Sequence, residues 1–139
     1  MARRYDQDCP IALSLDVIGE RWTLLLIRDL LREGPRRFQD FLASQPGLAP
    51  TVLSARLKVL EQHGLVTRRT YSAHPPRDEY VVTDKGRGLI PVISALRHWG
   101  AAHYQDAALI HVTCGHPVDL LPRCPSCDRD VDPAELEVA

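Results

Sequence analysis

The chain has 139 residues, of which 45% are hydrophobic, and a formal net charge of −1. This length corresponds to about one domain and is sufficient to bury an apolar core. No segment approaches the roughly 18 consecutive apolar residues of a membrane span, and no apolar run directly follows the basic N-terminal residues, so we expect a cytoplasmic protein with no signal peptide and no membrane partner.

Two helices are predicted at the start of the chain. Residues 10–19 form the first, because Pro10 suits the first helical position and Gly19 suits the end. Residues 21–33 are the most apolar segment, and their length and lack of Gly and Pro favour a buried helix over a strand. A Gly-Pro pair follows and ends this second helix.

Two further helices are predicted before residue 64. The first is short and covers residues 37–44, where apolar side chains recur at helical spacing. The second covers about residues 50–63 and is stopped by Gly64. Its apolar stripe, at positions i, i+4 and i+7, consists of Leu53, Leu57 and Leu60.

The periodicity then changes to that of a β-hairpin. Residues 65–71 and 78–83 are rich in Val, Thr and Tyr, and residues 72–77 between them are turn-forming. A long amphipathic helix is predicted from residue 84 to about residue 104, after a Thr-Asp pair that suits a helix start. Pro91 lies early in this helix and marks either a first-turn boundary or a kink. The fold is therefore mainly α with a small β-hairpin, in the order of a winged helix-turn-helix.

The fourth predicted helix has a polar face opposite its leucine stripe. Short side chains on this face would let the backbone approach the major groove of DNA, where Ser and Thr can bond bases or phosphates and Lys supplies charge. An ordinary exposed helix face is the alternative. The residues that we expect to bind DNA here are Thr51, Ser54, Ala55, Arg56 and Lys58.

Basic residues are concentrated around this helix and the hairpin. Residues 1–99 carry 15 Lys/Arg and 11 Asp/Glu, residues 100–139 carry 2 and 7, and residues 51–77 alone hold five basic residues and one acidic residue. A local basic face can bind phosphates whatever the net charge, and prolines that stiffen the hairpin tip reduce the entropic cost of a DNA contact. Further DNA contacts are expected from His74 and Arg77 at the tip and from Arg36 and Arg37 before the third helix.

Several motifs in the same order resemble the HxlR-type regulators, a winged-helix family akin to MarR proteins. Cys-Pro-Ile at residues 9–11 and Asp-Val-Ile-Gly-Glu-Arg-Trp-Thr-Leu-Leu at 16–25 are similar to the opening of this family, and three further motifs continue the match over about residues 8–100. They are Gly-Pro-Arg-Arg-Phe at 34–38, Val-Leu-Ser-Ala-Arg-Leu at 52–57 and Tyr-Val-Val-Thr-Asp-Lys-Gly at 80–86. The resemblance implies a homodimer, built from the N-terminal and C-terminal helices, that binds a pseudo-palindromic operator in double-stranded DNA.

The resemblance also suggests a role for Cys9. Members of this family often have an N-terminal cysteine that reacts with oxidants, quinones or aldehydes, and Cys9 matches that position. A thiol at a helix N-terminus lies near the positive end of the helix dipole, which favours the reactive thiolate. A sensor thiol and a small packing residue are the two interpretations of Cys9.

The C-terminal segment contains two pairs of metal-ligating residue types. His111 and Cys114 form one pair, Cys124 and Cys127 form the other, and nine residues separate the pairs. Four soft N and S ligands suit tetrahedral zinc, and clustered cysteines in a cytoplasmic protein favour metal over disulfide. We expect a structural zinc ion, with His116 competing with His111 for the fourth position. A disordered acidic tail and a disulfide between the last two cysteines are the alternatives.

Residues 8–104 are therefore assigned to a winged-helix domain for DNA binding and dimerisation, and residues 105–139 to a short zinc-ribbon-like extension. The sequence predicts a sequence-specific transcription regulator and not an enzyme, because it has no nucleophile–base pair, phosphate loop or Ser/His/Asp pattern in a plausible order. Two alternatives stay open. One is a winged-helix module that binds protein, and the other is a thiol- or zinc-dependent enzyme, which would require an activated Cys9 or an open metal site.

Overall fold

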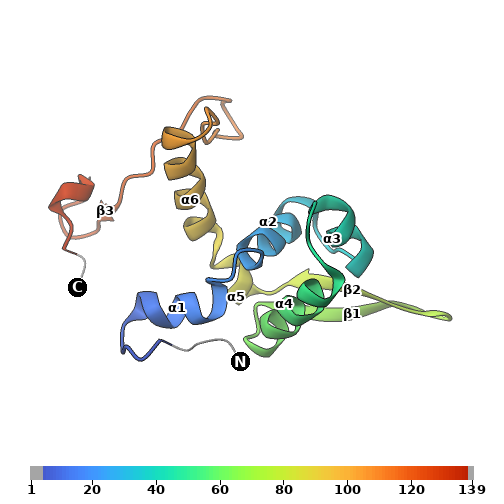
Figure 1. Cartoon of the computed structure of the whole chain (residues 1–139). Helices are drawn as coiled ribbons and strands as arrows, with labels where there is room; N and C mark the ends of the chain where they lie inside the picture. Colours follow the sequence, from blue (N-terminus) through green and yellow to red (C-terminus); the bar gives the residue numbers. More distant parts are fainter. Residues whose placement is uncertain (1–4, 138–139) are drawn as a thin grey trace. The chain divides into compact units, whose positions relative to one another are not determined.

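The computed structural model describes residues 5–137, which divide into two units between Ile90 and Pro91. The first unit contains, in chain order, α1 (Pro10–Ile18), α2 (Thr23–Glu33), α3 (Phe38–Ser44), α4 (Pro50–Gln62), β1 (Val66–Ala73), β2 (Pro76–Val82) and α5 (Asp84–Arg87) (Figure 1). The second contains most of α6 (Ile90–His103), then β3 (Arg123–Cys124), β4 (Arg129–Asp130) and a 3-10 turn, η1 (Pro133–Glu135). No helix in the described residues is long and apolar enough to cross a membrane.

The core of the first unit lies between α2, α3, α4 and the base of the β1–β2 hairpin. The leucine stripe predicted for α4 is confirmed, because all three of its side chains are buried. Each such side chain contributes about 1.5–3 kcal/mol by leaving water. The largest buried apolar side chains are Leu26, Ile27 and Leu30 of α2, Phe41 of α3, and Leu53, Leu57 and Leu60 of α4.

The second helix begins two residues later than the predicted segment 21–33. The carboxylate of Glu20 accepts hydrogen bonds from the backbone N–H of Trp22 (3.0 Å) and from the hydroxyl of Thr23 (3.5 Å). These bonds stabilise a turn before the helix, so the regular i→i+4 pattern starts only at Thr23.

Strands β1 and β2 form an antiparallel hairpin that projects beyond the helices of the first unit (Figure 1). The turn predicted over residues 72–77 is too long. Ser72 pairs with Arg77 and Ala73 pairs with Pro76, which leaves only two residues for the turn. A proline at the first position of a strand is compatible with pairing because its missing N–H need not join the ladder.

The single helix predicted over residues 84–104 is two helices. Thr83 caps α5 by accepting a hydrogen bond from the backbone N–H of Gly86 (3.1 Å), and α6 begins at Ile90. Pro91 therefore lies in the first turn of α6, where its missing N–H leaves no intrahelical bond unmade, and the predicted boundary is confirmed. Gly86 packs so closely that an added Cβ would overlap the carbonyl of Leu65.

Candidate nucleic-acid interface

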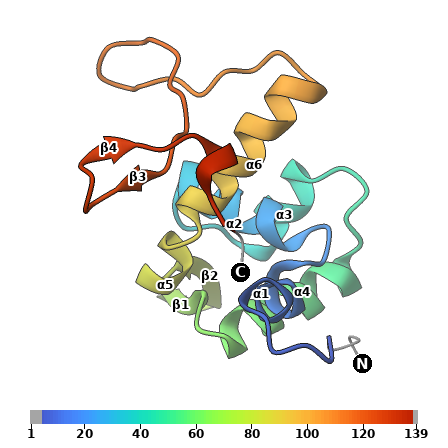
Figure 2. The same ribbon diagram turned by 90° about the vertical axis from the view of Figure 1, so that its left-hand side faces the viewer.

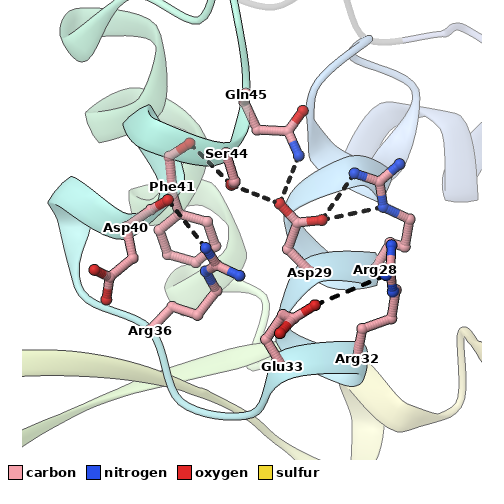
Figure 3. A network of polar contacts seen from close by, with 9 residues as sticks. All are labelled: Arg28, Asp29, Arg32, Glu33, Arg36, Asp40, Phe41, Ser44 and Gln45. Atoms are coloured by element: carbon pink, nitrogen blue, oxygen red, sulfur yellow. Dashed lines mark hydrogen bonds and ion pairs between the residues drawn. The ribbon is translucent and has the colours of Figure 1, made fainter.

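The buried carboxylate of Asp29 joins α2 to the end of α3 and to the turn that leads into α4 (Figure 3). It accepts hydrogen bonds from the Ser44 hydroxyl (3.0 Å), the side-chain amide of Gln45 and the guanidinium of Arg28 (2.8 Å). Burial raises the pKa of Asp29, but the hydrogen bonds from Arg28, Gln45 and Ser44 outweigh burial and lower it below the ordinary value. This network fixes the helix-turn-helix geometry from which α4 is presented.

Helix α4 presents a polar face to solvent and an apolar face to the core. Pro50 occupies its first position, so Thr51 lies in the first turn, where recognition helices usually contact bases. Arg56 is half-buried at the edge of the core. The other predicted residues of this face are all exposed: Thr51, Ser54, Ala55 and Lys58.

A groove of about 530 Å³ lies between the polar face of α4 and the base of the hairpin. From α4 it is lined by Ser54 and Lys58, together with two further polar side chains, and from the hairpin by Arg68 and Tyr80. The groove places the outer face of α4 directly beside the hairpin, so both elements can contact one extended ligand.

Arg36, predicted to contact phosphate, has bonds within the first unit. Its backbone exchanges two hydrogen bonds with Tyr80 of β2 (3.0 and 2.7 Å). Its guanidinium donates to the carbonyl of Asp40 (3.0 Å) and lies over the ring of Phe41 (Figure 3). A phosphate contact would compete with the guanidinium bond to Asp40, and the DNA contact expected of Arg36 stays a prediction. No local sequence pattern indicated that Arg36 pairs with β2.

Arg37, its neighbour, is exposed. Its guanidinium donates to the carboxylate of Asp40 (3.1 Å). Hydrogen bonds to Asp40 and then to Tyr71 raise the pKa of Arg37, so the group is charged at any physiological pH. Arg37 therefore places a fixed positive charge at the start of α3, with part of that charge balanced by Asp40.

The two arginines in β1 are paired with carboxylates that sequence analysis overlooked. Arg69 donates to Glu79 (2.9 Å), its partner across the hairpin, and Arg68 lies 3.7 Å from Glu61 and 3.9 Å from Asp78. Because residues directly opposite one another in an antiparallel pair interact, an explicit strand register would have predicted the first of these pairs. The arms of the hairpin therefore carry less unpaired positive charge than their number of basic residues indicates.

The hairpin tip keeps its positive charge available. His74 and Arg77 are both exposed. Within residues 5–137, none of the ion pairs involves Arg56, Lys58 or Arg77. Lys58 on the outer face of α4 and Arg77 at the hairpin tip are therefore cations without a carboxylate partner among the described residues.

Cys9 lies directly before α1, at the N-cap position, and is half-buried. Its backbone carbonyl accepts a hydrogen bond from the N–H of Leu13 (2.9 Å), whereas its side chain makes no capping bond. The thiol is thus at a helix N-terminus, as predicted from the position of Pro10.

Helices α1 and α6 both expose apolar side chains. On α6, Val92, Leu96 and Trp99 follow the i, i+4, i+7 pattern of one helix face, and Trp99 is 55% exposed. No residue of α6 is buried. On α1, Ile11 and Leu15 are also exposed. Each helix therefore leaves apolar side chains exposed to solvent.

The predicted zinc ligands form two separate pairs. Nδ1 of His111 lies 3.1 Å from Sγ of Cys114. Hydrogen bonds from Cys127, through its backbone and then its side chain, and from the backbone of Ser126 lower the pKa of Cys124. All four cysteines are free, and within residues 5–137 no three His, Cys, Asp or Glu side chains are grouped so as to hold a metal ion.

Comparison with known proteins matches this chain to helix-turn-helix regulators. Residues 17–108 match the model of the HxlR-like helix-turn-helix family. Rv3095 of Mycobacterium tuberculosis, an uncharacterized HTH-type transcriptional regulator, is 36% identical over 126 residues, which make up 87% of this chain and 78% of that protein.

Two solved structures extend the comparison to the fold. PA1607, a candidate transcription factor, is 35% identical, covers 96% of both chains and has a TM-score of 0.80. The redox regulator HypR in its oxidized form is 35% identical, with a TM-score of 0.63 over 68% of this chain and 97% of its own. With its helix-turn-helix and hairpin, the chain belongs to the HxlR-like helix-turn-helix family and is a transcriptional regulator with a winged-helix fold.

Proposed function

We propose that this regulator binds double-stranded DNA as a homodimer, with α4 in the major groove and the β1–β2 hairpin on the adjacent phosphate backbone. The observation that carries the proposal is the exposed polar face of α4, held over a buried leucine stripe and beside a projecting hairpin. Near the start of α4, Thr51, Ser54 and Ala55 would read base edges, because short side chains let the helix approach them.

Phosphate contacts would come from the cations that have no carboxylate partner. Lys58 on α4 and Arg77 at the hairpin tip fit this role, because neither is committed to an ion pair within the described residues. His74 at the tip and Arg56 at the edge of α4 would add to the contact. Contacts to phosphate fix the position and orientation of the protein, whereas base contacts provide sequence choice.

The homodimer would be built from α1 and α6. Both helices expose apolar stripes, and α6 buries none of its residues in the isolated chain. A second copy of the chain would remove Leu96 and Trp99 from water at about 25 cal/mol per Å² of apolar surface. A two-fold dimer would present two copies of α4 to half-sites about one helical turn of DNA apart, or a multiple of that spacing.

The proposal is tested by selecting genomic fragments that the full chain binds, and then measuring affinity for the selected duplex at increasing salt. We expect a pseudo-palindromic site and a linear fall of log affinity with log salt. Ala55→Glu places a carboxylate where α4 would contact the major groove of DNA, and this substitution should abolish binding. Ala108→Glu adds the same charge outside the winged helix and should leave binding unchanged. Salt-independent binding, or none to duplex DNA, would favour a module that binds protein.

We further propose that Cys9 makes DNA binding responsive to oxidants or electrophiles. Its place at the N-terminus of α1 supports this, as does the similarity of the chain to HypR, a redox regulator. Modification of the thiol would act on α1, which the proposed dimer also uses. The relatives are named as transcriptional regulators, which favours a regulatory role over a catalytic one.

Sensing is tested by adding hypochlorite or a quinone to the protein–DNA complex and following release of DNA. Wild-type protein should release the duplex, and Cys9→Ser should retain it. Ser14→Ala, which changes an exposed residue of α1 but keeps the Cys9 thiol, is the control and should still release DNA. Equal release by wild type and Cys9→Ser would exclude Cys9 as the sensor.

A further inference from the structure

Two turns in the C-terminal segment have the same backbone design. In the first, Ile110 pairs with Pro117 across the turn that holds His111 and Cys114. In the second, Arg123 pairs with Asp130 across the turn that holds Cys124 and Cys127. In each turn, the bridge joins the residue before the first ligand-type side chain to the residue three places after the second. The two turns are thus equivalent position by position.

The equivalence extends to the residue that follows each second side chain. Gly115 follows Cys114 with φ +73°, and Asp128 follows Cys127 with φ +52°. A left-handed backbone conformation is uncommon for residues other than Gly. At Asp128 it is stabilised by Arg123, which donates hydrogen bonds to the Asp128 carboxylate (2.6 Å) and carbonyl (3.1 Å). Both turns therefore reverse the chain immediately after the second side chain, which leaves the two side chains of each pair on the same side of a tight loop.

The side chains of each pair are already close together. The Nδ1 atom of His111 is 3.1 Å from Sγ of Cys114, and Cys124 receives hydrogen bonds from Cys127 and Ser126. His116 makes a different contact: its carbonyl accepts a hydrogen bond from the backbone N–H of His111 (2.9 Å). The ring of His111 already contacts Cys114, which favours His111 over His116 as the nitrogen donor.

We propose that these two turns are zinc knuckles and that His111, Cys114, Cys124 and Cys127 together bind one Zn²⁺ per chain. Three thiolates and one imidazole form a soft, four-coordinate donor set of the kind that closes a structural zinc site. On binding, the three thiols lose their protons to solvent and each sulfur donates an electron pair to the metal. The inference is independent of the proposed DNA contacts, which lie in the first unit.

The absence of an apolar core in this segment gives zinc a physical role. None of residues 105–137 is buried. A segment without a core needs a disulfide, a metal or a partner to hold one conformation. Figure 2 draws the loop after α6 and the β3–β4 hairpin as separate features. Residues 118–122 connect them, and zinc binding requires this connection to bring the two knuckles to one ion.

Zinc content of the full chain, purified under reducing conditions, is the first test. Elemental analysis should give one zinc per chain. Replacement of zinc by Co²⁺ should give the ligand-field bands of a tetrahedral ion and the absorption of thiolate-to-cobalt charge transfer. The cobalt spectrum is recorded on the unsubstituted chain, so this readout does not depend on the folding of a variant. Absence of stoichiometric zinc, or two ions per chain, would overturn the proposal.

Substitutions assign the ligands. Cys114→Ser and Cys127→Ser should each lose the bound zinc, and His111→Ala should weaken its retention against a chelator. His116→Ala and Cys9→Ser are matched controls and should retain one zinc per chain. Zinc loss in His116→Ala with retention in His111→Ala would overturn the assignment. DNA binding by the zinc-free Cys127→Ser variant separates failure of this site from failure of the proposed function.

Discussion

The side-chain amide of Gln45 donates a hydrogen bond to the buried carboxylate of Asp29, and this bond connects the turn of the helix-turn-helix to the middle of α2 (Figure 3). Gln45 is itself buried, at 5% exposure. A polar side chain in an apolar core is stable when it has a hydrogen-bond partner, and Gln45 and Asp29 supply one to each other. The pair therefore sets the position of the turn, and through the turn the direction in which α4 leaves the core.

Asp29→Ala should destabilise the first unit by about 2–4 kcal/mol, because Gln45 and Ser44 would lose their acceptor inside the core. Urea unfolding followed by circular dichroism measures this change. Glu33→Ala removes a carboxylate from the same helix, where Arg32 lies 3.8 Å away on the surface, and should change stability by less than about 0.5 kcal/mol. Equal effects of the two substitutions would show that the network around Asp29 contributes no more than a surface ion pair.

Stability should fall on acidification partly through Asp29. Its pKa is lower in the folded chain than its ordinary value, so folding favours the charged carboxylate. This contribution is present in full above the unfolded pKa of about 3.9 and is lost as the pH falls through the lower folded pKa. Unfolding midpoints from pH 7 to pH 3 should therefore decline more steeply for wild type than for Asp29→Asn. Parallel curves would contradict this assignment.

Arg77→Ala should weaken binding to every duplex by a similar factor, because a phosphate contact carries no sequence information. The slope of log affinity against log salt should become shallower by about 0.9, the value for one phosphate contact. Arg32→Ala, which removes an exposed cation from α2, is the control and should change neither quantity. A gel-shift series in which Arg77→Ala affects only the specific operator would give Arg77 a role in base reading.

Leu96→Glu should convert the proposed dimer to a monomer, because the stripe on α6 would then carry a charge into the interface. Light scattering with size-exclusion chromatography measures the mass. Arg97→Glu changes the charge of the next residue, off the Val92–Leu96–Trp99 stripe, and should leave the dimer intact. A dimeric Leu96→Glu protein would exclude this face of α6 from the interface.

Local patterns were sufficient to predict most elements of the first unit. The spacing of Leu53, Leu57 and Leu60 identified both α4 and its buried face, since a helix repeats every 3.6 residues regardless of what it packs against. Pro91 indicated either a first-turn boundary or a kink, because a missing N–H acts on its own helix, and the structure shows the first of these at the start of α6. The shared motifs of residues 8–100 then indicated the family, which the comparisons show.

Partners between distant segments could not be predicted in the same way. Arg36 and Arg37 are neighbours with the same side chain, yet Arg36 pairs with β2 and lies over Phe41, whereas Arg37 is exposed. The bond between Asp29 and Gln45 likewise depends on how α2 meets the end of α3. The sequence by itself determined the first four helices, the polar face of α4 and the position of the hairpin. Only the tertiary structure decided which charges are committed to other residues, because an ion pair or a buried hydrogen bond depends on atoms that folding brings together from separate parts of the chain.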